Sequence, residues 1–125
     1  MNAEQYQPGV CNIGGPEIAK RKQVAYFGGF LFVIYAVAVF VKDFTLIFSI
    51  VPALIFSIGF IQSRKKFCLA YGLLGTFNFQ NFGTMSKVMD RQALAADRRT
   101  ALGIILQSIG LALILSSILA LLAAI

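Results

Sequence analysis

Two side chains in this sequence could carry out covalent chemistry, the thiols of Cys11 and Cys68. The sequence has no histidine, which excludes a histidine general base, a histidine metal ligand and a Cys-His pair. Two cysteines alone do not make a metal site, so we expect no metal, no other cofactor and no catalytic residues. Lysine and arginine residues lie near the cysteines, and positive charge favours a thiolate. One interpretation is a redox or persulfide-relay pair; the other is two reduced thiols that only pack.

The elements that position these thiols belong to a membrane protein. Hydrophobic residues make up 58% of the 125 residues and charged residues 13%, against roughly 45–50% and 25% in soluble proteins. A soluble domain of this size could not bury so much apolar surface, and disordered chains have the opposite composition. The composition predicts an all-α integral membrane protein.

Three uncharged stretches, residues 24–41, 44–61 and 100–125, are long enough to cross a membrane as helices. Eighteen helical residues extend roughly 27 Å, close to the thickness of the hydrocarbon core. Only Lys42 and Asp43 separate the first two stretches, which predicts a tight antiparallel transmembrane hairpin.

The stretches divide the chain into four segments of one membrane domain. We expect a cytoplasmic N-terminal tail (1–15), the hairpin (16–63), a cytoplasmic interfacial segment with an amphipathic helix (64–99) and a third transmembrane helix (100–125). The amphipathic helix either lies on the membrane or runs straight into the third span.

Basic residues orient the chain in the membrane. All of the eleven Lys and Arg residues except Lys42 lie before the first stretch or between the second and third. The positive-inside rule then places the N-terminus in the cytoplasm and the C-terminus outside, in a bacterial inner membrane. The net charge of +6 indicates binding to anionic lipid headgroups rather than to nucleic acid. The expected headgroup residues are Lys20, Arg21, Lys22, Arg64, Lys65, Lys66, Arg98 and Arg99.

Small residues recur at helical spacing inside the stretches. The second stretch has Ser49, Ala53 and Ser57 four residues apart, and the third has a seven-residue series. Such stripes let helices approach closely in lipid, either within the monomer or across a homo-oligomer or larger complex. The seven-residue series is Gly103, Gly110, Ser117 and Ala124.

The segment from Phe67 to Phe79 is apolar but only 13 residues long. It is too short to span, which favours an interfacial or re-entrant segment in which Gly72 and Gly75 allow bending or close packing. Pro52, midway along the second stretch, predicts a kink.

Short motifs resemble the YgaP-like family of small bacterial inner-membrane proteins of unknown function. The resemblance covers about residues 11–79 and includes Asn12-Ile13-Gly14, Glu17, Arg21 and the run from Phe67 to Gly75. It implies a transmembrane pair, sometimes attached to a rhodanese sulfur-transfer domain for which this chain has no room. Leu69 stands where the family pattern has Pro, and the third stretch lies outside the pattern.

Three functions fit these patterns. The first is a non-enzymatic structural or accessory membrane protein that packs into a homo-oligomer or a larger complex. The second is a small oligomeric channel or carrier for an uncharged or anionic solute, using Pro52, Gln107 and the glycine-containing short segment. The third is a thiol-based sulfur or redox protein that uses Cys11 and Cys68. The sequence names no substrate.

Overall fold

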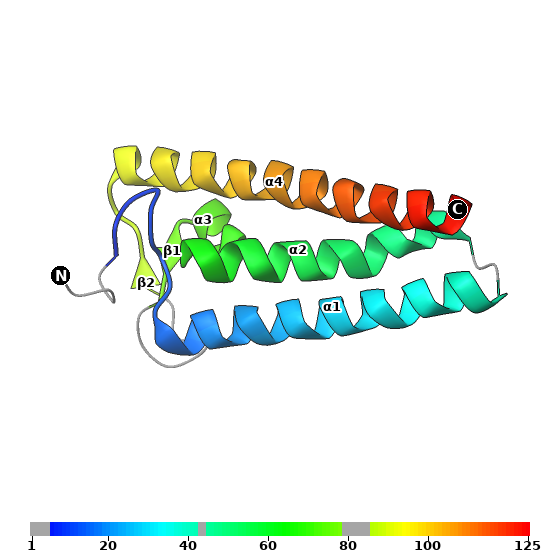
Figure 1. Cartoon of the computed structure of the whole chain (residues 1–125). Coiled ribbons are helices and arrows are strands. Elements are labelled where there is room, and N and C mark those ends of the chain that lie inside the picture. Colours follow the sequence, from blue (N-terminus) through cyan, green and yellow to red (C-terminus); the bar gives the residue numbers. More distant parts are fainter. Residues whose placement is uncertain (1–5, 43–44, 79–85) are drawn as a thin grey trace.

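The computed structural model describes residues 6–42, 45–78 and 86–125, and three helices in these residues are long and apolar enough to span a membrane. The three helices expected from the sequence are therefore present. Helix α2 packs between the other two, which contact each other little (Figure 1). The spans are α1 (Gly15–Lys42), the 3-10 turn η1 (Leu46–Ser49) continued by α2 (Ile50–Lys65), and α4 (Arg91–Ala124).

The hairpin forms because two glycines bring the backbones of α1 and α2 together. A Cβ added at Gly28 would overlap the backbone nitrogen of Phe56, and one at Gly59 would lie 2.5 Å from that of Ala25. Only glycine permits such an approach without moving a helix. The expected turn begins at Lys42, where α1 ends, but Asp43 lies outside the described residues.

Pro52 lies in the first turn of α2 rather than in the middle of an α-helix. The second span instead changes from the 3-10 turn η1 to α-helix at Ser49 and Ile50. The first turn of an α-helix has backbone N–H groups without helical partners, so a proline there sacrifices no hydrogen bond.

Helix α4 is continuous from Arg91, so the boundary expected at residues 99 and 100 falls inside a helix. The Asp90 side chain caps its N-terminus by accepting a 3.2 Å hydrogen bond from the backbone N–H of Ala93. The amphipathic segment and the third span are thus one element.

The small residues of the second span are buried, as a packing face requires. Ser49, Ala53 and Ser57 are all enclosed, and the Ser49 hydroxyl donates a 3.1 Å hydrogen bond to that of Ser116 on α4. The stripe therefore lies at the packed side of α2.

The stripe on α4 behaves differently: of the two possibilities left open by the sequence, packing within the monomer is not seen. A Cβ added at Gly103 or Gly110 would meet no atom within 4 Å, and Ser117 and Ala124 are exposed. The face of α4 that does pack carries Ala101, Ile104, Ser108, Ala112 and Leu119. Packing of the stripe across an oligomer stays a prediction.

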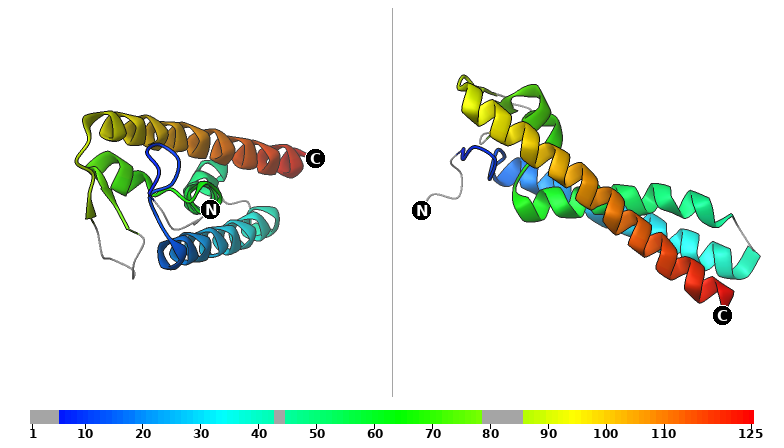
Figure 2. Two further views of the ribbon diagram at one scale, coloured as in Figure 1. Left: turned by 90° about the vertical axis from the view of Figure 1, so that its left-hand side faces the viewer. Right: turned by 90° about the horizontal axis from the view of Figure 1, so that it is seen from above.

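Short elements gather at one end of the three spans, and the left view of Figure 2 looks onto that end. They are the N-terminal segment, α3 (Leu69–Leu74), and the antiparallel strands β1 (Thr76–Phe77) and β2 (Ser86–Lys87). The strand pair departs from the all-α prediction. Helix α3 is about 9 Å long at 1.5 Å per residue, too short to cross a membrane. We call residues 6–14, 66–78 and 86–90 the cap.

Candidate functional site

Cys68 is positioned by the sharp end of α2. Lys66 adopts a left-handed conformation with φ of 54°, which ends the helix and turns the chain back. Phe67 then enters the core with Ala101 and Ile104 of α4. Cys68 follows as the N-cap residue of α3 and is itself buried.

Asn12 fixes the backbone at Cys68 from the N-terminal segment. Its Oδ1 accepts a 2.7 Å hydrogen bond from the Cys68 N–H, and its Nδ2 donates a 3.1 Å bond to the Cys68 carbonyl. The Asn12 N–H also donates to the carbonyl of Lys66 at 3.2 Å. One fully buried amide thus holds the thiol-bearing residue at two points.

Arg21 joins the thiol to a buried carboxylate. Its Nη2 lies 3.0 Å from the Cys68 Sγ and 3.2 Å from Glu17 Oε1. Glu17 and Arg21 are four residues apart on α1, a spacing that places them on one face. The Glu17 side chain is 0% exposed and that of Arg21 is 16% exposed. A buried carboxylate requires such a partner because its desolvation is costly.

The second oxygen of Glu17 binds two further donors. Its Oε2 accepts hydrogen bonds from the Tyr71 hydroxyl at 2.5 Å and from Asn78 Nδ2 at 2.9 Å. Burial, together with the bond to Glu17, raises the pKa of Tyr71 to about 12, so this phenol is a donor at neutral pH. Asn78 is in turn held by the N-terminal segment, since its N–H donates to the Asn12 carbonyl at 2.9 Å.

These residues form one connected network that we call the Arg21 cluster. It brings together the N-terminal segment, the start of α1, α3 and the residue after β1. Chemically, it presents a sulfur to a fixed guanidinium, which suits a sulfur that carries or develops negative charge. Its members are Asn12, Glu17, Arg21, Cys68, Tyr71 and Asn78.

Cys11 lies in a different environment, although both cysteines are buried and neither forms a disulfide. Its thiol donates a 3.6 Å hydrogen bond to the carbonyl of Ile13. Burial raises the pKa of Cys11, which favours the neutral thiol. The two expected thiols therefore differ: the Cys11 thiol donates, whereas the Cys68 sulfur accepts from Arg21.

A second polar network, the Asp97 cluster, ties the N-terminal segment to α4. The fully buried Asp97 carboxylate accepts from the Tyr6 hydroxyl at 2.6 Å and from the Gly9 N–H at 2.7 Å. The Thr100 hydroxyl donates to the Gly9 carbonyl at 2.6 Å. Burial and the bond to Asp97 both raise the pKa of Tyr6. Gly9 has φ of 70°, a conformation that favours glycine.

Arg21 is not a headgroup residue, which corrects the sequence prediction. Its guanidinium is directed into the cap by Glu17 and Cys68. The other expected headgroup residues are exposed on the ends of the helices or just beyond them. They are Lys20, Lys22, Arg64, Lys65, Lys66, Arg98 and Arg99.

Sequence reasoning noted Glu17, Arg21 and the run that contains Cys68 and Tyr71 as short motifs, but it predicted no contact between them and did not single out Asp97. The available signal was scarcity, because the chain has only five acidic residues and charges are rarely placed near membrane spans without a role. Among the described residues, no group of three or more Cys, Asp, Glu or His side chains could hold a metal.

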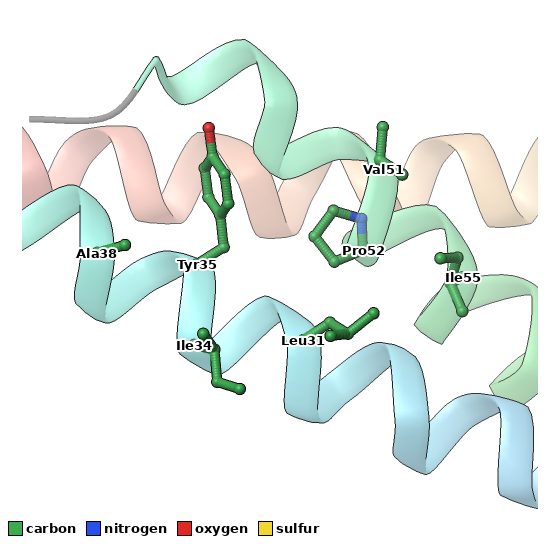
Figure 3. Close-up of a pocket in the computed structure, with 7 residues that line it drawn as sticks. All are labelled: Leu31, Ile34, Tyr35, Ala38, Val51, Pro52 and Ile55. Carbon is green, nitrogen blue, oxygen red and sulfur yellow. The ribbon is translucent and has the colours of Figure 1, made fainter.

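An apolar hollow of about 310 Å³ lies between α1 and the start of α2 (Figure 3). Its walls are aliphatic except for Tyr35, whose hydroxyl donates to the carbonyl of Thr45. Gln107, which the channel hypothesis used, is exposed on α4 and does not line this hollow. The lining residues are Leu31, Ile34, Tyr35, Ala38, Val51, Pro52 and Ile55.

The Arg21 cluster, built on a fixed guanidinium, a buried carboxylate and a thiol, is therefore the candidate site. Its residues include Asn12, Glu17 and Arg21, on which the expected resemblance to the YgaP-like family rests. Comparisons of the whole chain with protein families, with curated proteins and with solved structures found no match.

Proposed function

We propose that this chain is a small integral membrane protein with a structural or accessory role. It associates through α4 with another membrane helix, from a second copy or a larger complex. The observation that carries the proposal is the open space beside Gly103 and Gly110, where an added Cβ would meet no atom within 4 Å. Two glycines in a spanning helix weaken it unless they serve a close approach.

The position of these glycines around α4 supports an outside partner. At about 100° per residue, positions nine apart lie roughly 180° apart on a helix. Gly110 is nine residues after Ala101, and Gly103 is nine before Ala112. Ala101 and Ala112 are buried inside the chain, so the glycines occupy the opposite side of α4. A helix that packs on both sides needs small residues on both.

Substitution of Gly110 tests the association. Gly110→Ile adds a side chain where the chain itself has room, so the monomer should fold while the assembly dissociates. Leu113→Ile, at an exposed apolar position, is the control and should leave the assembly intact. The readout is native mass spectrometry from mild detergent together with cross-linking in the native membrane. An unchanged assembly in Gly110→Ile would refute the proposal.

We further propose that the cap faces the cytoplasm of a bacterium and that the C-terminus lies outside. The exposed basic residues Lys20, Lys22, Arg64 and Lys65 all flank the cap end of the spans, which supports this orientation. A reporter fused after Ile125 should be active only on the periplasmic side. Cytoplasmic activity of that reporter would reverse the topology.

A second candidate function is thiol-based sulfur or redox chemistry at Cys68. The specific observation is the 3.0 Å contact of the Arg21 guanidinium with the Cys68 Sγ, because a fixed hydrogen-bond donor with positive charge stabilises negative charge that develops on the sulfur during a reaction. The resemblance to a family that includes sulfur-transfer fusions points in the same direction. Cys11 serves as the internal comparison, since its buried thiol donates to a carbonyl instead.

Alkylation under native conditions separates this candidate from a packing role. If Cys68 is reactive, it should be alkylated faster than Cys11 or carry a persulfide in gently solubilised protein, as seen by mass spectrometry. Arg21→Gln should slow its alkylation, whereas Lys65→Gln should not. If both thiols are alkylated equally slowly and neither carries a persulfide, the thiol function is rejected and only the structural role remains.

A further inference from the structure

A second hollow lies between α1 and α2 near the cap, separate from the Arg21 cluster. Its volume is about 220 Å³. We call it the basic groove, and its lining residues are Lys22, Ala25, Tyr26, Phe60, Ser63 and Arg64.

Two cationic and two aromatic side chains line the groove. Lys22 comes from α1 and Arg64 from the last turn of α2, so the positive charges stand on different helices of the hairpin. The Arg64 guanidinium lies over the Phe60 ring, 5.9 Å from its centroid, an arrangement that holds the charge in place. No acidic residue is among the described residues that line the groove.

The groove also sits where the apolar surface of the spans gives way to charge. Tyr26 is 75% exposed and Phe60 39% exposed, so the aromatic side chains face outward beside the cations. Aromatic side chains next to basic ones are typical of the level of lipid headgroups. Basic pockets between spanning helices on the cytoplasmic side are suited to anionic headgroups.

We propose that the basic groove binds one anionic phospholipid, with its phosphate between Lys22 and Arg64 and its acyl chains beside Tyr26 and Phe60. A phospholipid matches both the charge and the apolar walls, whereas a free phosphate would use only the charge. The site is distinct from diffuse attraction of the basic end to the membrane, because it requires two particular cations that share one hollow.

A tryptophan reporter tests the groove directly, because the chain has no native tryptophan. Tyr26→Trp places the reporter at the groove, in vesicles that contain small amounts of brominated phosphatidylglycerol or brominated phosphatidylcholine. We expect the anionic lipid to quench the reporter at about 25-fold lower mole fraction than the zwitterionic lipid, since the two basic residues each contribute about fivefold in affinity. Equal quenching by the two lipids would overturn the proposal.

Charge-matched variants separate a site from diffuse attraction. In the reporter background, Lys22→Gln/Arg64→Gln should reduce the preference to about twofold or less. Lys65→Gln/Arg99→Gln removes the same charge from exposed residues outside the groove and should retain the preference. Equal losses in both double variants would mean diffuse attraction and would reject the groove. If the groove double variant does not fold, the two single variants are compared with Lys65→Gln and Arg99→Gln in the same way.

Competition distinguishes the lipid from a free anion. Sodium phosphate and sodium chloride at equal ionic strength should affect the preference for phosphatidylglycerol equally. If sodium phosphate alone abolishes the preference, the groove takes a free phosphate and the lipid assignment is wrong.

Discussion

The cap and the spanning bundle of this protein are held together by opposite kinds of contact. At the junction of the cap with α1 and α4, buried Glu17 and Asp97 organise charged and hydrogen-bonded networks. In the bundle, the absent side chains of Gly28 and Gly59 let two backbones meet. Lipid gives apolar side chains little reason to leave it, so helices there gain from close fit. At the cap, polar and charged groups that are buried away from water must be hydrogen-bonded or ion-paired instead.

The difference between the two regions predicts that the largest loss of stability comes from an unpaired charge where α1 meets the cap. Glu17→Gln leaves Arg21 without its carboxylate and should lower the free energy of unfolding by about 3 kcal/mol. The measurement is denaturant unfolding in detergent, followed by circular dichroism. The double variant Glu17→Gln/Arg21→Gln removes both charges and should lose less than the two single losses added together. If the two single losses add up in the double variant, Glu17 stabilises the fold through contacts other than its ion pair with Arg21.

A single methyl group in the bundle should have the next largest effect. Gly59→Ala places a Cβ 2.5 Å from the backbone nitrogen of Ala25 and should cost about 2 kcal/mol, because two helices must separate. Gly103→Ala is the matched control, since its Cβ meets no atom within 4 Å. Thermal unfolding of monomeric protein in detergent should therefore separate the two variants. Similar midpoints would show that the hairpin tolerates wider spacing.

High pH should weaken the cap through Tyr71. Because its pKa is raised to about 12 in the folded protein from the ordinary 10.0, its contribution is complete below pH 10 and disappears as the pH rises toward 12. Tyr71→Phe should remove this part of the alkaline loss, so its stability should fall less steeply over that interval. Parallel pH profiles for the two proteins would contradict the raised pKa.

The smallest effect should come from the polar contact inside the bundle. Ser49→Ala removes the hydrogen bond to Ser116 and should cost about 0.6 kcal/mol, the average for such bonds in membranes. Ser116→Ala should cost the same amount, and the double variant no more than either one. If Ser49→Ala lowers the free energy of unfolding as much as Glu17→Gln does, polar contacts are as important in the bundle as at the cap, and the contrast between the two regions is wrong.

The spans could be predicted from the sequence because hydropathy is a local property of consecutive residues. The sequence left open whether the helix before residue 100 runs into the third span, because Asp97, Arg98 and Arg99 read as the end of a membrane segment. These residues are instead part of a helix whose Asp97 is buried by the N-terminal segment. The motifs of the Arg21 cluster were noted in the sequence, but their contacts were not predicted: Cys68 lies 47 positions from Arg21 and 56 from Asn12, and no periodicity within one helix links them.

The N-terminal segment also determines when the protein can finish folding. Tyr6 and Gly9 bind Asp97 across 91 and 88 positions, and Gly9 binds Thr100 across 91. During synthesis, the first residues of this segment must wait until α4 has been made. Contacts between positions so far apart close slowly, because the chain loses the entropy of the whole intervening loop before it gains the bonds. Insertion of the hairpin and closure of the cap are therefore separate events, and a chain interrupted before Asp97 leaves its N-terminal segment undocked from α4.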